Sequence, residues 1–257
     1  MTKIKLIFLV TALALGSCDK SNQDFTDSEK SGSQPSPVVM SRHQLSVAAN
    51  PSNPYDSIGI LHNLFLDTLR KYVSQTGDTS RTGKGAYLQQ VARAYRGISF
   101  QPTDNPESEV NICTDYKSVL LNQPVSVDCK AILHRLVEVL DGVQSANAFN
   151  SYANKIKAIE LEVMNAGFMQ REEQFLLTVS SVMRHSGYYW MEAFNNGGVA
   201  HPMGLGKFLR KIAGLLALIG ADATTAGYHY LKNSPYDHLI LESAWMSEVC
   251  QYYTAHW

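Results

Sequence analysis

The sequence predicts an all-α protein whose folded part is a single-domain multi-helix bundle. Three observations support this fold class. Apolar residues recur at helical spacing through most of the chain after residue 50, alternating strand patterns are scarce, and glycines at 142, 167 and 197–198 fall where helices should stop. Residues 51–257 provide about two hundred residues, which is enough for one well-packed domain.

The predicted helices follow one another through this domain and are separated by loop residues. In the segment 128–142, for example, four aliphatic residues lie on one helical face: Leu133, Leu136, Val137 and Leu140. Residues 97–106 are predicted to form a loop, and one short helix is predicted between residue 106 and Pro124. The predicted helical segments are 54–76, 84–96, 115–121, 128–142, 147–167, 169–194, 205–231 and 235–253.

The first eighteen residues, MTKIKLIFLVTALALGSC, have the layout of a secretory signal, with a basic start, an apolar run over 6–15 and small residues before Cys18. The run of about ten residues is too short for a bilayer, which needs about twenty. Its end, LGSC, resembles the lipobox of bacterial lipoproteins, in which the signal is cut before a cysteine that receives lipid. The resemblance implies a signal over 1–17 and acyl chains such as palmitate on Cys18, which bind membrane lipid. A plain secretory signal with an incidental Cys18 is the alternative.

The segment from Cys18 to residue 50 is predicted to be a disordered tether. It is rich in Ser, Asp, Gln, Gly and Pro and too poor in large apolar residues to offset the entropy of ordering. Acidic residues soon after the lipidated cysteine also resemble the signal that sends Bacteroidetes lipoproteins to the outer face of the cell. We therefore expect a lipid-anchored protein of the cell envelope, at the surface or periplasmic face of the outer membrane. Asp19, next to the cysteine, leaves retention in the inner membrane as the alternative.

Charge and cysteine content argue against nucleic acid, a metal or a cofactor as a partner. Cleavage of the signal removes Lys3 and Lys5 and leaves 20 basic against 23 acidic residues, without a basic stripe, so nucleic acid is not expected as a partner. Beyond the anchor three cysteines remain. A bridge from Cys113 to Cys129 is one possibility in an oxidising compartment, and buried, inert thiols are the other. Cys-x-x-Cys pairs and zinc-type spacings are absent, so neither a metal nor a cofactor is expected.

The segment NPYD predicts a helix start. Asn53 is a good N-cap, Pro54 suits the first helical position, and Asp56 completes an arrangement similar to a capping box while favouring the positive helix end. The same pattern recurs at the last helix, where Ser234 and Asp237 are the expected cap residues.

A histidine and an asparagine, His62 and Asn63, follow in the same helix. On a helical projection His62 lies on the buried stripe and Asn63 on its flank. A buried imidazole needs a partner, and Asp222 is the most conspicuous candidate because it lies in a segment of small and apolar residues where an unpaired carboxylate is costly. We therefore hypothesise that Asp222 accepts a hydrogen bond from His62 where the two helices cross. The pair would act either as a structural lock or as a polar functional site.

The segment NPYDSIGILHN, from residue 53 to 63, also resembles a segment of mostly helical Bacteroidetes lipoproteins, N-P-Y-D-x-x-G-x-x-H-N. These proteins also carry an Asp-bearing helix rich in alanine and glycine near the end, to which ADATTAG at 221–227 is similar. The resemblance implies a helical fold and an envelope address. It implies no reaction, and no catalytic residue is carried over from it.

Motifs of common enzymes are absent from the sequence, which has no GxSxG elbow, no phosphate-binding glycine loop and no HExxH. Taken singly, His185, His201 and His238 are expected at the surface or at helix ends. The aromatic residues of SGYYWMEAF and CQYYTAHW belong either to the core or to a groove for a carbohydrate or peptide. The sequence thus favours a binding or assembly component with a protein, peptide or carbohydrate ligand. The alternative is a small hydrolase-like enzyme with a site at His62 and Asp222.

Overall fold

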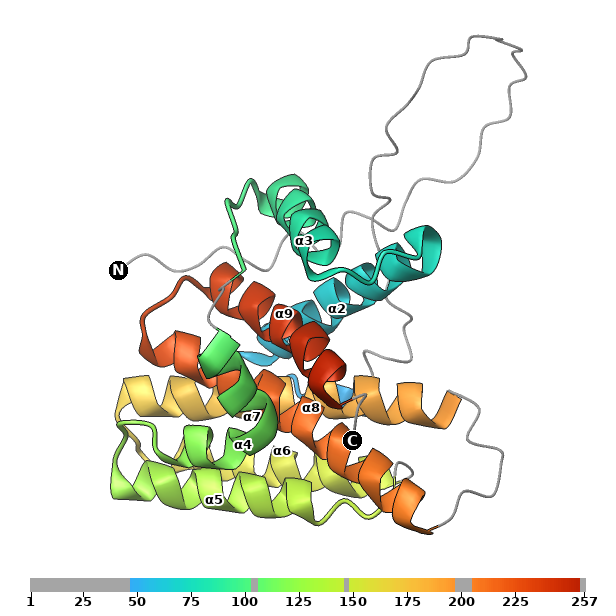
Figure 1. The fold of residues 1–257 in the computed structure, drawn as a ribbon. Coiled ribbons are helices and arrows are strands. Elements are labelled where there is room, and N and C mark those ends of the chain that lie inside the picture. The colour runs from blue at the N-terminus through green and yellow to red at the C-terminus, as the bar shows by residue number, and fades with distance from the viewer. Residues whose placement is uncertain (1–46, 103–105, 146–147, 197–204, 255–257) are drawn as a thin grey trace, which may run out of the picture. The chain divides into compact units, whose positions relative to one another are not determined.

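The computed structural model describes residues 47–257 except 103–105, 146–147, 197–204 and 255–257 (Figure 1). The signal, Cys18 and most of the expected tether lie outside the described residues, as does His201. The described part contains eight α-helices and no strand, which confirms the all-α, multi-helix fold. The helices are α2 (Asp56–Thr76), α3 (Arg81–Arg96), α4 (Pro106–Leu121), α5 (Val127–Asp141), α6 (Phe149–Asn165), α7 (Gln170–Asn196), α8 (Leu205–Leu231) and α9 (Tyr236–Thr254).

Helix α4 is longer than the predicted short helix over 115–121. Its extra first half begins at Pro106, and Glu107 and Glu109 follow in the first turn, where proline and acidic residues both favour a helix start. The backbone kinks at Asp115, whose φ and ψ of −142° and 51° are not helical. The Asp115 carboxylate accepts from the backbone N–H of Ser118 at 3.2 Å and so caps the second half.

The core forms around α7, α8 and α9. α7 packs against α2, α6 and α8, while α9 packs against α2, α4 and α8 (Figure 1). α3 lies outermost and contacts α2 and α9, so its first turn is held beside α9. Among the described residues, none of the helices has the length and hydropathy of a membrane span.

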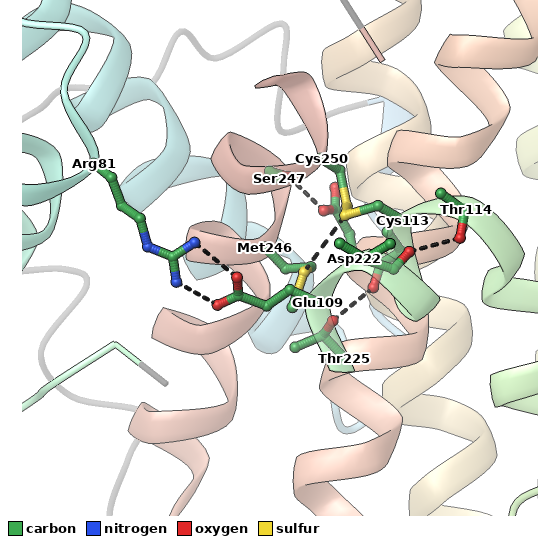
Figure 2. Close-up of a disulfide and its surroundings, with 11 residues drawn as sticks. Arg81, Glu109, Cys113, Thr114, Asp222, Thr225, Met246, Ser247 and Cys250 are labelled. Atoms are coloured by element: carbon green, nitrogen blue, oxygen red, sulfur yellow. Dashed lines mark hydrogen bonds and ion pairs between the residues drawn. A yellow bond between two sulfur atoms is a disulfide. The ribbon is translucent and has the colours of Figure 1, made fainter. Parts of the chain in front are cut away.

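The structure contradicts the predicted bridge between Cys113 and Cys129. Cys113 on α4 is instead bonded to Cys250 on α9, with a Cα–Cα distance of 5.1 Å, within the range that disulfides require (Figure 2). Cys129 is free and buried in the first turn of α5, where burial raises the pKa of its thiol to about 12. Proximity in sequence misleads here because Cys113 faces α9, whereas Cys129 packs into the core from α5.

Candidate functional site

The start of α2 differs from the predicted capping box. α2 begins at Asp56, and a turn over Pro54 and Tyr55 precedes it. Asn53 caps that turn, since its Oδ1 accepts from the backbone N–H of Tyr55 at 2.8 Å. The backbone N–H of Asn53, the expected partner of Asp56, donates to the carbonyl of Asn50 instead, and Asp56 Oδ2 accepts from the backbone N–H of Asn50 at 3.0 Å. Both Asn53 and Asp56 are buried and face other helices.

The start of α9 shows the same displacement. The helix begins at Tyr236, and the carbonyl of Pro235 accepts from the backbone N–H groups of His238 and Leu239. Pro235 therefore occupies the cap position, one residue after the expected Ser234, and the Ser234 hydroxyl is 3.3 Å from His229 Nδ1. Asp237 is in the first turn, as predicted, where a carboxylate favours the positive helix end.

A cluster of charged side chains is buried where α2, α6 and α7 meet. At its centre, Arg184 of α7 donates from Nη2 to Asp56 Oδ1 at 2.6 Å and to Glu160 Oε1 at 3.0 Å, and its side chain has no exposed surface. His185 Nε2 lies 3.0 Å from the same Asp56 oxygen. We call this group the Arg184 cluster; its members are Asn50, Asn53, Asp56, Glu160, Arg184 and His185.

Two asparagines complete the coordination of the Glu160 carboxylate. Asn53 Nδ2 donates to Glu160 Oε1 at 2.8 Å, and Asn50 Nδ2 donates to Oε2 at 2.6 Å. Ser180 Oγ adds a third donor at 3.1 Å. A buried carboxylate is tolerated when it is paired and fully hydrogen-bonded, and Glu160 meets both conditions.

The protonation of the Arg184 cluster follows from these contacts. Burial alone raises the pKa of the Asp56 carboxyl, but the hydrogen bond from His185 and the charge and hydrogen bond of Arg184 outweigh burial and leave that pKa below its usual value. Burial lowers the pKa of His185, and its contact with Asp56 offsets only part of that effect. A neutral His185 with its proton on Nε2 can donate to the ionised Asp56.

A second polar cluster lies further along α2 and α7. Asp222 of α8 accepts from Ser186 Oγ at 2.6 Å and from Trp190 Nε1 at 3.3 Å. It also accepts from the hydroxyl of Ser247 (Figure 2). His62 Nε2 lies 3.3 Å from Asp222 Oδ2, and both side chains are fully buried. We call this group the Asp222 cluster; its members are His62, Ser186, Trp190, Asp222, Ser243 and Ser247.

The structure brings His62 and Asp222 together, as the hypothesis requires, but without a directed hydrogen bond from Nε2. The other nitrogen, Nδ1, is 3.0 Å from Ser243 Oγ, and that hydroxyl also reaches the carbonyl of Ile240 at 2.9 Å. If Ser243 donates to Ile240, Nδ1 must carry the proton of a neutral ring, and bare Nε2 then faces the carboxylate. In the other tautomer Nε2–H faces the carboxylate and Nδ1 accepts a hydrogen bond from the Ser243 hydroxyl. Helix α2, which carries His62, and helix α8, which carries Asp222, are held together by α7 and α9, each of which packs against both.

Gly59 explains why α7 comes so close to α2. A Cβ at this position would lie 2.6 Å from His185 Cδ2 and 2.6 Å from the carbonyl oxygen of Ser181, so only glycine fits. The Gly59 N–H, which has no partner within the first turn of α2, donates to Ser181 Oγ at 3.2 Å. The close packing of α7 against α2 also covers Asn63. Contrary to its predicted place on the flank, it is buried and donates to the carbonyl of His185 at 2.8 Å.

Other single-residue expectations also change. His185 is buried in the Arg184 cluster and is not at the surface. Of the aromatics in SGYYWMEAF, Tyr189 and Trp190 are buried, and Tyr188 and Phe194 pack against the core. Tyr189 also lines a surface cavity beside α2. The side chains of Tyr252, Tyr253 and Trp257 lie outside the described part of the chain.

Access to the two clusters decides what chemistry they can perform. His62 and Asp222 have no exposed side-chain surface, and neither lines any of three cavities that described residues form elsewhere. Within the described ranges, no group of three or more histidine, cysteine, aspartate or glutamate side chains could hold a metal ion. No protein-family model, curated protein or solved structure matches this chain. The contacts of both clusters join helices: the Arg184 cluster joins α2, α6 and α7, and the Asp222 cluster joins α2, α7, α8 and α9.

Sequence reasoning missed Arg184 and Glu160, which carry most of the charge in the first cluster. One signal was present. The middle of α7 reads VSSVMRHSGYYW, with polar residues on every helical face, so some of them had to be buried. Arg184 is separated in the sequence by 128 residues from Asp56 on α2 and by 24 residues from Glu160 on α6. No local pattern encodes contacts at such separations.

Proposed function

We propose that this chain is a lipid-anchored lipoprotein of the bacterial cell envelope, which acts as a binding or assembly component at the outer membrane. Acyl chains on Cys18 hold it to membrane lipid, and the residues up to 50 act as the tether. The lipobox-like end of the signal, LGSC, supports the anchor. The ligand is a protein, a peptide or a carbohydrate.

The disulfide supports an address outside the cytosol. Cys113 and Cys250 are both completely buried, and their bond joins α4 to α9. Structural disulfides form and persist in oxidising compartments and are rare where thiols are kept reduced. A chain exported through its signal meets that condition, and a cytosolic chain does not.

The observation that carries binding over catalysis is the complete burial of His62 and Asp222. A general base must come within hydrogen-bond reach of a substrate, or within reach through one water. The imidazole of His62 instead lies among Asp222, Ser243 and the helices that cover them. Other described residues line three surface cavities, and a ligand can enter these without reaching His62 or Asp222.

Metabolic labelling with a palmitate analogue tests the anchor. Cells expressing the full chain should show a labelled protein in the membrane fraction, and Cys18→Ser should remove both the label and the membrane association. Cys129→Ser is the matched control because it removes a buried thiol elsewhere in the chain and should leave the label unchanged. Label retained by Cys18→Ser would refute the anchor. Separation of inner and outer membranes then tests the outer-membrane assignment against retention through Asp19.

A further inference from the structure

A cavity of about 490 Å³ lies where α7 and α9 begin and α8 ends. The first turn of α7 contributes Gln170, Arg171 and Gln174 to its lining, and Tyr230 and Tyr236 lie on the side of α8 and α9. The volume is within the range of small-molecule sites, about 300–1,000 Å³. Gln170, Arg171 and Tyr236 are exposed, so a ligand can reach these side chains from solvent. In this respect the cavity differs from the two buried clusters.

The described residues that line this cavity carry one positive charge, on Arg171, and no negative charge. Nη2 of Arg171 donates to the carbonyl of Leu231 at 2.7 Å and to Asn233 Oδ1 at 3.2 Å, and both acceptors are neutral. Its Nε and Nη1 donate to none of the described residues, and no described carboxylate pairs with the guanidinium. Glu172 and Glu173 follow in the same turn of α7 but do not line the cavity. The cavity thus presents a guanidinium that is held in place and whose charge is not neutralised.

A carboxylate is the anion that best complements this arrangement. It accepts charged hydrogen bonds from a guanidinium, whose planar geometry matches its own. It also carries a single negative charge, which the single arginine neutralises. A phosphate monoester carries about −1.5 to −2 charges at neutral pH and would leave part of its charge unpaired. Charge complementarity at Arg171 therefore favours a carboxylate over a phosphate.

Exposed apolar side chains near the cavity favour a peptide as the carrier of this carboxylate. Tyr236 is 46% exposed, and Met169, directly before α7, is 70% exposed. Val127 is 83% exposed, and Ser126 beside it donates to Glu172 in the first turn of α7. Tyrosine, methionine and arginine are the residue types enriched at protein interfaces. Apolar side chains of a peptide can cover this surface, whereas a sugar would place hydroxyl groups against it.

Two side-chain amides in the cavity have donors and acceptors to spare. Gln174 uses only its Oε1, which accepts from the hydroxyl of Tyr230 at 2.6 Å, and the side chain of Gln170 bonds to none of the described residues. An amide side chain both donates and accepts, as a peptide unit does. The amides can therefore pair with the backbone of a peptide whose end is held at Arg171.

We propose that this surface binds the free C-terminal end of a peptide or protein with apolar last residues, a ligand class that rests on the proposed binding function. Arg171 binds the terminal carboxylate. The apolar side chains pack against Tyr236 and Met169, and the amides of Gln170 and Gln174 bond to the last peptide units. Capture of a terminal carboxylate is a known mode of peptide recognition.

A library of synthetic heptapeptides, attached to beads through their N-termini, tests the site with the purified full-length chain in detergent. The best binder is then made with a free C-terminal carboxyl and with a C-terminal amide, and calorimetry compares the two. The amide should bind about tenfold more weakly or worse, since hydrogen bonds to a charged group contribute at least that factor. This comparison changes only the ligand, so it does not depend on the folding of a variant.

Variants of the protein locate the site. Arg171→Gln should weaken binding of the free-acid peptide by about tenfold or more and should leave binding of the amide unchanged. Arg135→Gln is the matched control because it removes an exposed arginine that pairs with Glu162 and does not line the cavity. It should leave binding of both peptides unchanged, and thermal melting checks that both variants fold.

Four results would overturn the proposal: no free-acid peptide binds, the amide binds as tightly as the acid, Arg171→Gln binds the acid normally, or Arg135→Gln weakens binding equally. An acidic glycan that binds through Arg171, where no peptide does, would overturn the peptide as ligand and leave the proposed binding function standing. Palmitate labelling of the same preparation tests the anchor independently.

Discussion

Replacing Arg184 by methionine should lower the free energy of unfolding by about 3–5 kcal/mol, the usual cost of removing one partner from a buried ion pair. The guanidinium is fully buried and pairs with both Asp56 and Glu160, so its removal leaves two carboxylates without their cation. Glu160 has no exposed surface and cannot regain hydration without opening the packing. For a domain of this size the melting temperature should fall by roughly 6–20 °C.

The pH dependence gives this prediction a distinct sign. In the native chain the pKa of Asp56 is lowered, so its contribution to stability is present above its ordinary value of 3.8 and is lost as the pH falls through the lowered pKa. In Arg184→Met the charge and hydrogen bond that help to lower the pKa of Asp56 are gone, so burial raises that pKa and folding favours the protonated carboxyl. The folded variant then binds more protons than its unfolded chain, and its stability falls as the pH rises. The difference between the two proteins should therefore shrink on acidification from pH 7 towards pH 4.

Urea unfolding followed by circular dichroism measures the free energy of unfolding and its dependence on pH. The measurements use a Cys18→Ser background, which lacks the expected lipidation site. The double variant Arg184→Met with Glu160→Gln should recover part of the loss, because one of the two stranded charges is removed, and a double-mutant cycle gives the coupling between these positions. A loss below about 1 kcal/mol at pH 7, or a difference that does not change with pH, would show that the cluster is not a tightly coupled ion-pair network.

Three further predictions concern close packing, the disulfide and a histidine. Gly59→Ala should cost about 1–3 kcal/mol through the clash with α7, whereas Gly85→Ala, whose Cβ would meet its nearest atom at 3.5 Å, should be neutral or stabilising; equal melting temperatures would contradict this. Reduction of the bond between Cys113 and Cys250 should lower stability by about 2–5 kcal/mol, seen as a drop in melting temperature on adding dithiothreitol. Burial lowers the pKa of His229 from 6.5 to about 4, so stability should decline as the pH falls between these values, and His229→Gln should remove that part of the decline in a urea titration.

Helix positions could be predicted because the signals that set them are local. The segment 205–231 was predicted from its apolar spacing and coincides with α8, and the ends of α2, α5 and α7 fall within a few residues of the predicted ones. The first half of α4 was missed because its apolar pattern is weak, although proline and two glutamates mark its start. Local signals are also imprecise by one or two residues at helix ends, which is the error made at Asn53 and Ser234.

The candidate site was only partly predictable. Burial of His62 followed from helical periodicity, and its meeting with Asp222 followed from the cost of a lone carboxylate in an apolar segment. The pairing of Cys113 with Cys250 and the contacts of Arg184 depend on which helices pack together. Tertiary packing decides which helices meet, so the sequence around these residues gives no signal of their contacts.

The position of α9 has a consequence for the order in which this protein can be assembled. Among the described helices α9 comes latest in the chain, yet it packs against α2, supplies Ser243 to His62 and Ser247 to Asp222, and closes a disulfide with a cysteine 137 residues earlier. Until α9 is added, α2 lacks the helix that covers part of its buried face, and Cys113 lacks its disulfide partner. Contacts this distant in the chain make folding slow and leave apolar surface open to chaperones and proteases in the meantime. A chain that stops before α9 would keep that apolar surface exposed. Chaperones and proteases could then distinguish the truncated chain from the complete fold by this surface.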